Sequence, residues 1–177
     1  AIERSQKHNR LEEMPVHIVK KLLDCYVAAC TTKDKEGNAP LHSAVEVLTD
    51  HKDAVVEMLV KADPKCCQLR DHDGNLPIHS AVECKEICEQ SINMIADAYP
   101  EGMGYKDKSG NLPLHSAIER SQKHNRLEEM PVHIVKKLLD CYVAACTTKD
   151  KEGNTPLHSA VEVLTDHKDA VVEMLVK

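Results

Sequence analysis

The apolar residues of this chain recur at the spacing of an α-helix over short segments. The clearest stripe consists of Leu41, Ala44, Val45 and Leu48, which share one face of a helix with 3.6 residues per turn. Polar and charged residues occupy the positions between them. The pattern therefore predicts short amphipathic helices, each with one face turned toward its neighbours.

A second set of helices is predicted downstream of the first. The segments Val55–Val60, Ser91–Ala96 and Ile134–Leu139 align without gaps and place their apolar residues at helical spacing. The helix that contains Ser91–Ala96 should end at Tyr99–Gly102, and the one before it at Ala62–Pro64, because proline cannot continue a helix. The chain is thus expected to alternate between first and second helices.

A polar motif precedes each first helix. Near-copies of Asp-x-x-Gly-Asn-x-Pro-Leu-His begin at Asp34, Asp71, Asp107 and Asp150. The Asp-to-Asn part is typical of a tight turn in which Gly adopts a positive φ, and Pro suits the first turn of a helix. The residues expected to build these turn–helix junctions are Gly37, Pro40, His42, Gly74, Pro77, His79, Gly110, Pro113, His115, Gly153, Pro156 and His158.

The motif divides the chain into repeats inside a longer period. Successive motif glycines are 37, 36 and 43 residues apart, and residues 1–61 reappear as residues 117–177 with Thr155 in place of Ala39. Three unequal repeats therefore form a super-repeat of 116 residues. The expected organisation is one array with the divisions 1–33 (partial), 34–70, 71–106, 107–149 and 150–177 (partial).

The longest insertion of the super-repeat is Arg120–Glu129, with its copy Arg4–Glu13. We expect this insertion to lie between the two helices of its repeat. It should project from the side opposite the turns.

Each unit has a turn with Gly-x-x-Pro-Leu-His-x-Ala, a helix, a loop and a second helix with Val-x-x-Leu-Leu, and this order resembles the ankyrin repeat over the whole chain. The resemblance implies an all-α helix-turn-helix solenoid with projecting turns or hairpin tips. It also implies that the motif histidine ties the turn to the helix by hydrogen bonds. Two features differ from the family: the repeats of 36 to 43 residues exceed the usual 33, and only Thr155 supplies the Thr of Thr-Pro-Leu-His.

The same resemblance implies protein partners that bind on the concave face, at the turn tips and the first helices. The tip residues expected to contact a partner are Lys35, Glu36, His72, Asp73, Lys108 and Ser109. They are polar and variable, which is typical of a recognition edge and equally of a solvated turn.

Composition and charge narrow the function classes. Phe and Trp are absent, so the core must be aliphatic and sulfur-containing, which suits thin helical layers. A net charge of −6 without a basic cluster argues against nucleic-acid binding. No apolar run has the length of a membrane span, and no secretory signal pattern begins the chain.

The candidate chemistry is sparse. Asp71–Asn75 is similar to a calcium loop, but its glycine stands at the fourth place rather than the sixth. No nucleophile with a paired base, phosphate-binding glycine loop or carboxylate pair can be assembled. We therefore expect neither catalysis nor a cofactor.

Eight cysteines and eleven histidines raise the possibility of a metal site. The best local set is Cys84 and Cys88 with His79, but Cys-x-x-Cys pairs are absent, so buried thiols are the simpler expectation. Cys30 and Cys67 occupy equivalent positions in successive repeats and should lie about 8 to 10 Å apart, too far for a disulfide. Reduced thiols indicate an intracellular protein.

These features together predict a non-catalytic protein–protein interaction scaffold, as a segment of a longer structural array or filament. An adaptor for one specific protein partner is the alternative, and a structural zinc-binding helical protein is a third hypothesis. Ala1 is expected within a first helix and Lys177 in the last turn of a second helix. Both end faces would then be bare, so the segment should fray or associate end to end.

Overall fold

The computed structural model describes residues 16–46, 51–84, 87–124, 132–163, 172–173 and 175–176. These residues are helical or form turns and loops, and none of them belongs to a β-strand. The prediction of an all-α protein is therefore confirmed for this part of the chain. None of the helices that the described residues form is long and apolar enough to cross a membrane.

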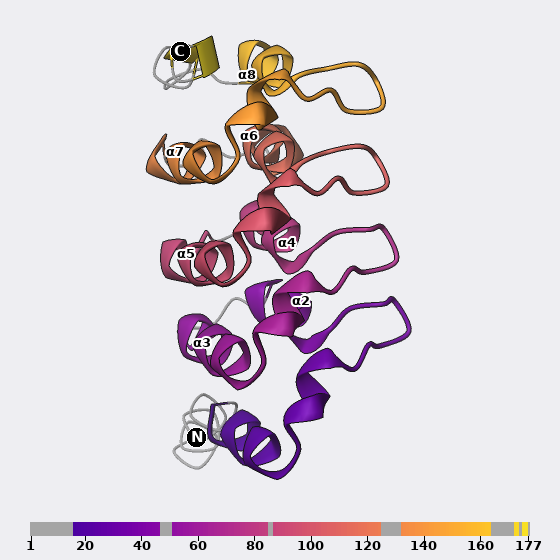
Figure 1. Ribbon diagram of the computed structural model, residues 1–177, viewed down its shortest axis with the longest axis vertical. Coiled ribbons are helices and arrows are strands. Elements are labelled where there is room, and N and C mark those ends of the chain that lie inside the picture. Colours follow the sequence, from indigo (N-terminus) through magenta and orange to yellow (C-terminus); the bar gives the residue numbers. More distant parts are fainter. Residues whose placement is uncertain are drawn as a thin grey trace, which may run out of the picture.

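The first helices of the repeats form one column. They are α2 (Pro40–Glu46), α4 (Pro77–Glu83), α6 (Pro113–His124) and α8 (Pro156–Val163). Each contacts the next in the series (Figure 1). All four begin at the predicted proline, whose fixed φ suits the first helical turn and whose missing N–H would have had no partner there.

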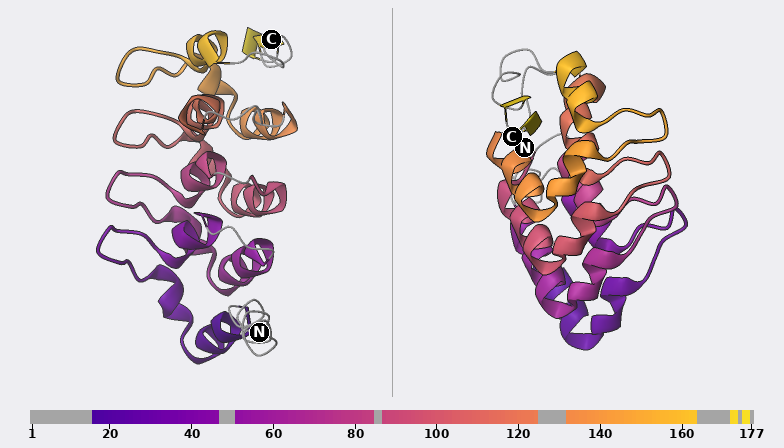
Figure 2. Two further views of the ribbon diagram at one scale, coloured as in Figure 1. Left: turned by 180° about the vertical axis from the view of Figure 1, so that it is seen from behind. Right: turned by 45° about the horizontal axis from the view of Figure 1, so that its top comes forward.

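The second helices form a parallel column beside the first. They are α3 (Lys52–Ala62), α5 (Glu89–Ala98) and α7 (Val132–Cys141), and a further helix spans residues 16–25. Each of α3, α5 and α7 packs on the first helix of its own repeat, and α5 contacts both α3 and α7. The four loops that carry the turn motif project together from the other side of the first helices (Figure 2).

Short 3₁₀ helices follow the second helices and were not anticipated from the sequence. They are η1 (Val27–Thr31), η2 (Pro64–Gln68), η3 (Pro100–Gly104) and η4 (Val143–Thr147). The predicted stops are confirmed, since α3 ends at Ala62 and α5 at Ala98. The prolines that stop these helices then start η2 and η3, where the side chain of Asp63 accepts a hydrogen bond from the N–H of Lys65 (3.0 Å).

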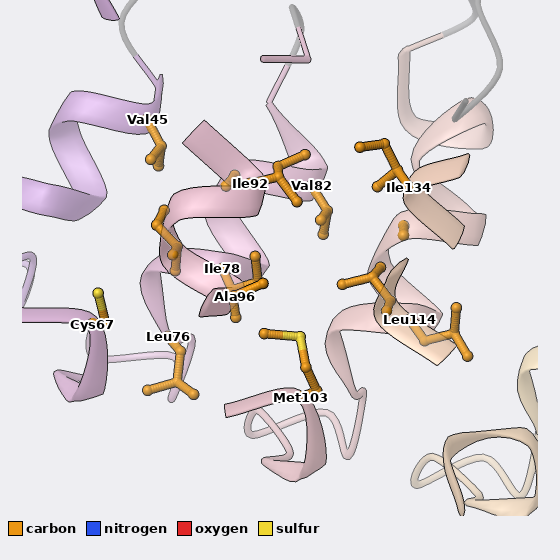
Figure 3. Packing of buried hydrophobic residues seen from close by; sticks show 14 of the residues in the cluster. Val45, Cys67, Leu76, Ile78, Val82, Ile92, Ala96, Met103, Leu114 and Ile134 are labelled. Atoms are coloured by element: carbon orange, nitrogen blue, oxygen red, sulfur yellow. The ribbon is translucent and has the colours of Figure 1, made fainter. Parts of the chain in front are cut away.

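The core is a thin layer of aliphatic side chains between the column of first helices and the column of second helices. Leu41, Ala44 and Val45 of the predicted stripe are buried, while Leu48 lies outside the described residues. Figure 3 shows Ile78 and Val82 of α4, Ile92 of α5 and Ile134 of α7 in this core. Leu and Ile supply most of the largest buried side chains, so the molecule needs no Phe or Trp.

The first residues of the insertion Arg120–Glu129 are helical, which was not predicted. The segment Arg120–Glu129 was expected to lie between helices, but α6 continues to His124 and has 12 residues, against 7 in α2. Arg120–His124 contains neither Gly nor Pro and carries Gln, Lys and Arg, which favour helix. Residues 125–131, the copy Arg4–Glu13, Ala1 and Lys177 lie outside the described residues.

Candidate functional site

Each projecting turn is closed by the aspartate at its start. In the first turn, Oδ1 of Asp34 accepts hydrogen bonds from the N–H groups of Glu36 (3.0 Å) and Asn38 (2.8 Å). The N–H of Asp34 in turn donates to the carbonyl of Asn38 (2.9 Å). Gly37 lies at φ +82°, a conformation that residues with a Cβ resist. Asp and Gly thus fix one turn shape, and the other three motif glycines repeat it with φ between 81° and 88°.

Backbone hydrogen bonds join each turn to the next. The N–H of His72 donates to the carbonyl of Glu36 (3.1 Å), and the N–H of Lys108 donates to that of Asp73 (2.8 Å). The last link runs from the N–H of Lys151 to the carbonyl of Ser109 (3.0 Å). The four turns therefore form a continuous ladder along one edge of the molecule.

The ladder arranges the six predicted tip residues in two columns, and all six are exposed. Lys35, His72 and Lys108 occupy the position that donates in the ladder, and Lys151 continues this column. Glu36, Asp73 and Ser109 occupy the accepting position, which Glu152 continues in the fourth turn. The backbone makes these links, so they do not require the tip side chains, which stay exposed.

Beside the two columns of tip residues lies a third column, made of basic residues. It was not predicted from the sequence. The signal was the basic residue that precedes each motif aspartate, namely Lys33, Arg70, Lys106 and Lys149. Nζ of Lys33 donates to the carbonyl of Arg70 (2.7 Å), and Nζ of Lys106 donates to that of Lys149 (2.5 Å). The guanidinium of Arg70 also lies 4.8 Å from the ring centroid of Tyr105. Lys33, Arg70 and Lys106 thus each donate a hydrogen bond to a backbone carbonyl of the next repeat.

The motif histidines connect the turn, the helix and the neighbouring repeat. Nδ1 of His42 accepts a hydrogen bond from the N–H of Ala39 (3.1 Å), and its Nε2 lies 3.1 Å from the carbonyl of Asn75 in the next turn. His79 repeats both contacts, with the carbonyl of Asn111 at 3.3 Å. With Nδ1 as acceptor, Nε2 carries the proton and donates to the next repeat.

His115 and His158 depart from this arrangement toward the C-terminal end. Nδ1 of His115 accepts from the N–H of Leu112 (3.2 Å), and its buried Nε2 makes no hydrogen bond of ordinary length and angle, although the carbonyl of Asn154 is near the ring. His158 accepts from the N–H of Thr155 (3.2 Å), and its ring is exposed. The imidazole is therefore buried only where another repeat covers it.

Burial changes the acidity of two of these imidazoles. Desolvation lowers the pKa of His79, against the opposing effects of the Asn111 carbonyl and the carboxylates of Asp107 and Glu83. Burial likewise lowers the pKa of His115. Both rings are thus kept neutral, as the accepting role of Nδ1 requires.

The candidate metal ligands have other partners. Sγ of Cys84 lies 3.6 Å from Nζ of Lys52, and Cys88 and Ser91 both hydrogen bond to the carboxylate of Asp53. Within the described ranges, no three His, Cys, Asp or Glu side chains are grouped closely enough to hold a metal ion.

The turn that is similar to a calcium loop uses its leading carboxylate internally. The side chain of Asp71 accepts from the N–H groups of Asp73 (2.8 Å) and Asn75 (2.8 Å) and from Nδ2 of Asn75 (3.0 Å). The carboxylate therefore closes the turn in the way that Asp34 does.

All eight cysteines are free thiols in this structure. Cys30 and Cys67 each occupy the fourth position of their 3₁₀ helix and are buried. Burial raises the pKa of Cys30, and the hydrogen bond with the neighbouring Cys67 thiol raises that of Cys66 further. The raised pKa disfavours the reactive thiolate at Cys30 and Cys66, whereas the same hydrogen bond lowers the pKa of the buried Cys67.

No protein-family model fits the chain, and no curated protein has a similar sequence.

Proposed function

We propose that this chain is a non-catalytic protein–protein interaction scaffold, built as a solenoid of ankyrin-like repeats and forming a segment of a longer structural array. The ladder from Glu36 to Lys151 is the observation that carries the proposal. It holds four exposed, chemically varied tips in one row while the backbone supplies every link. Such a row can contact an extended protein partner at several points at once.

The charges of the row favour a partner with both acidic and basic groups. Lys35, His72 and Lys108 stand beside Glu36 and Asp73, and the cations at Lys33 and Lys106 border them. Complementary charges of this kind contribute mainly to the specificity and rate of association. The free thiols are the feature that supports an intracellular setting.

Partner capture with a tip variant tests the proposal. The six residues Lys35, Glu36, His72, Asp73, Lys108 and Ser109 are all replaced by alanine, which keeps the backbone ladder. The control carries alanine at six exposed charged positions of the second helices, Lys20, Asp24, Glu57, Lys61, Lys136 and Asp140. Crosslinking and mass spectrometry should identify proteins bound by the parent and the control but lost by the tip variant. If no protein distinguishes the tip variant from the control, the tips are not the binding surface.

An adaptor that recognises one partner remains the alternative function. The middle tips, with His72, Asp73 and Ser109, differ from the outer tips, which are both Lys-Glu, and this difference would suit a single asymmetric partner. The mass of the intact source polypeptide separates the two functions. A mass of many 116-residue periods would support the array, and a mass near that of this chain would support the adaptor.

A further inference from the structure

One sequence occurs twice in this molecule with different surroundings. Residues 16–30 are identical to residues 132–146. In the second copy Ile134 and Leu138 are 0% and 1% exposed, whereas their counterparts Ile18 and Leu22 in the first copy are 42% and 60% exposed. The helix at residues 16–25 therefore presents an apolar face that the same sequence buries elsewhere.

The second copy shows what covers this face. α7 contacts α5 and η3 of the repeat 71–106, and Figure 3 shows Ile134 on the side of α7 that faces Ile92. Nζ of Lys137 lies 2.6 Å from the carboxylate of Asp97, and a Cβ at Gly104 would lie 3.4 Å from the ring of Tyr142. The cover is thus apolar at its centre and charged at its rim.

The helix at residues 16–25 and the residue after it have the same side chains that contact α5 and η3 in the second copy. Lys21 is the counterpart of Lys137, and Tyr26 is the counterpart of Tyr142, and both are exposed. On its other side, toward α2 and α3, the helix borders an apolar cavity of about 320 Å³ that Leu22 and Leu59 help to line. The apolar, charged and aromatic groups that hold α5 and η3 on α7 are therefore all present and uncovered.

The opposite end of the stack shows a second uncovered face. Val161 of α8 is 51% exposed, whereas its counterpart Val45 of α2 is 1% exposed. α2 is covered by α4 of the repeat 71–106, and His42 of α2 is buried beside the carbonyl of Asn75 in that repeat. His158, the counterpart of His42, is exposed.

We infer that both uncovered faces are docking sites for a repeat with the sequence of residues 71–106. The α5–η3 side of that repeat fits the helix at residues 16–25, and its α4 side fits α8. This inference rests on the proposed array and deepens it, because it names the element that must stand between two copies of this chain. Nowhere among the described residues does a face like that of α8 contact one like that of helix 16–25. Direct pairing of the two ends would therefore form an interface that the described part of this molecule does not contain.

An extended chain tests the inference. Residues 62–106 are appended after Lys177, so that the junction repeats the natural one after Lys61 and the new end presents an α5–η3 face. Each extended chain then carries a face and its complement at opposite ends, an arrangement that leads to open head-to-tail assembly. Sedimentation velocity across a wide concentration range compares it with the parent. We expect association of the extended chain to be tighter by about thirtyfold or more, as for an interface with a buried hot spot.

Two variants of the extended chain locate the contact. Ile18→Lys together with Leu22→Lys should abolish the added association, and the fold should be kept because both side chains are already exposed. Val143→Lys, at an exposed apolar residue of η4, is the matched control and should associate as the extended parent does. Circular dichroism checks that all chains retain their helix content.

Two results would overturn the inference. One is an extended chain that associates no more tightly than the parent, and the other is a double variant that associates as tightly as the extended chain. The partner capture described above uses the chain without the appended repeat, which adds a turn tip of its own. It therefore gives a separate answer on the proposed function.

Discussion

The backbone nitrogen of Lys151 lies so close to Gly110 that a Cβ at Gly110 would be 2.7 Å from it. Gly153 has the same left-handed conformation, with φ +88° against +85°, but a Cβ there would meet nothing within 4 Å. These glycines occupy the same position in two copies of the motif, so they separate the effect of backbone conformation from the effect of contact with the next turn. A residue with a Cβ would be strained at either position, and only at Gly110 would the Cβ also meet the next turn.

The first prediction uses this pair. Gly153→Ala should lower the free energy of unfolding by about 1 to 2 kcal/mol, the cost of a left-handed residue with a Cβ. Gly110→Ala should cost at least about 1 kcal/mol more, because the ladder bond between Lys151 and Ser109 must also shift. Urea denaturation measures both losses, and equal losses would show that contact between turns contributes nothing.

The elements that follow from neighbouring residues were predictable from the sequence. Pro40 marks the start of its helix, and Gly37 adopts the positive φ of its turn, because each preference is a property of the residue itself. The bond from Lys33 to the carbonyl of Arg70 joins residues 37 apart and depends on how repeats stack. η2 was missed because a turn of 3₁₀ helix is too short to show an apolar period.

The sequence predicted the positions of the tip residues but not the hydrogen bonds that join one turn to the next. The sequence placed the six tip residues on turns, and all are exposed. It could not show that the N–H of His72 bonds to Glu36, because backbone groups are the same in every residue. Nor could it distinguish His42 from His158, since the burial of each ring depends on whether another repeat covers it.

The second prediction concerns pH. Burial lowers the pKa of His79 and His115 below the ordinary value of 6.5. Between the folded and unfolded pKa values, these histidines therefore bind more protons in the unfolded chain than in the folded chain. The contribution of these residues to stability is therefore complete above about pH 6.5 and falls as the pH decreases toward the folded pKa values. The loss should approach about 1.4 kcal/mol per pH unit for each histidine in that window.

Urea denaturation of the parent and of His79→Gln between pH 7.5 and pH 5 measures this slope. The variant should be less stable at pH 7.5 and should lose less stability on acidification. His158→Gln, at the exposed motif histidine, is the control and should follow the parent. A His79→Gln curve parallel to that of the parent would contradict the assignment.

The third prediction compares a core residue with a tip residue of one repeat. Leu114 is buried in the core cluster, so Leu114→Ala should cost about 2 to 5 kcal/mol. Lys108 is exposed and contributes its backbone N–H to the ladder, so Lys108→Ala should cost about 0.5 kcal/mol or less. Similar shifts of the denaturation midpoint for the two variants would refute this division between core and tip.

The fourth prediction concerns the thiols. All eight cysteines should remain unpaired, so the intact mass measured without reductant should equal that of the fully reduced chain. Exposed Cys25 should react first with a thiol reagent, while Cys30, Cys66 and Cys67 should react only on unfolding, because they are buried. An intact mass lower by two or more hydrogens would show that a disulfide forms.

The last prediction compares the two identical helices in one molecule by amide hydrogen exchange. Residues 16–25 and 132–141 have the same sequence, so their intrinsic exchange rates are equal and any difference in protection reports local opening. Lys20→Arg, at an exposed position, gives the two peptides different masses. Because Ile18 and Leu22 lack the cover that Ile134 and Leu138 have, residues 16–25 should open more readily and exchange about tenfold faster or more, a difference of about 1.4 kcal/mol in local stability. Equal protection of the two helices would mean that the uncovered face does not weaken its helix, and that stability in this stack does not depend on contacts between neighbouring repeats.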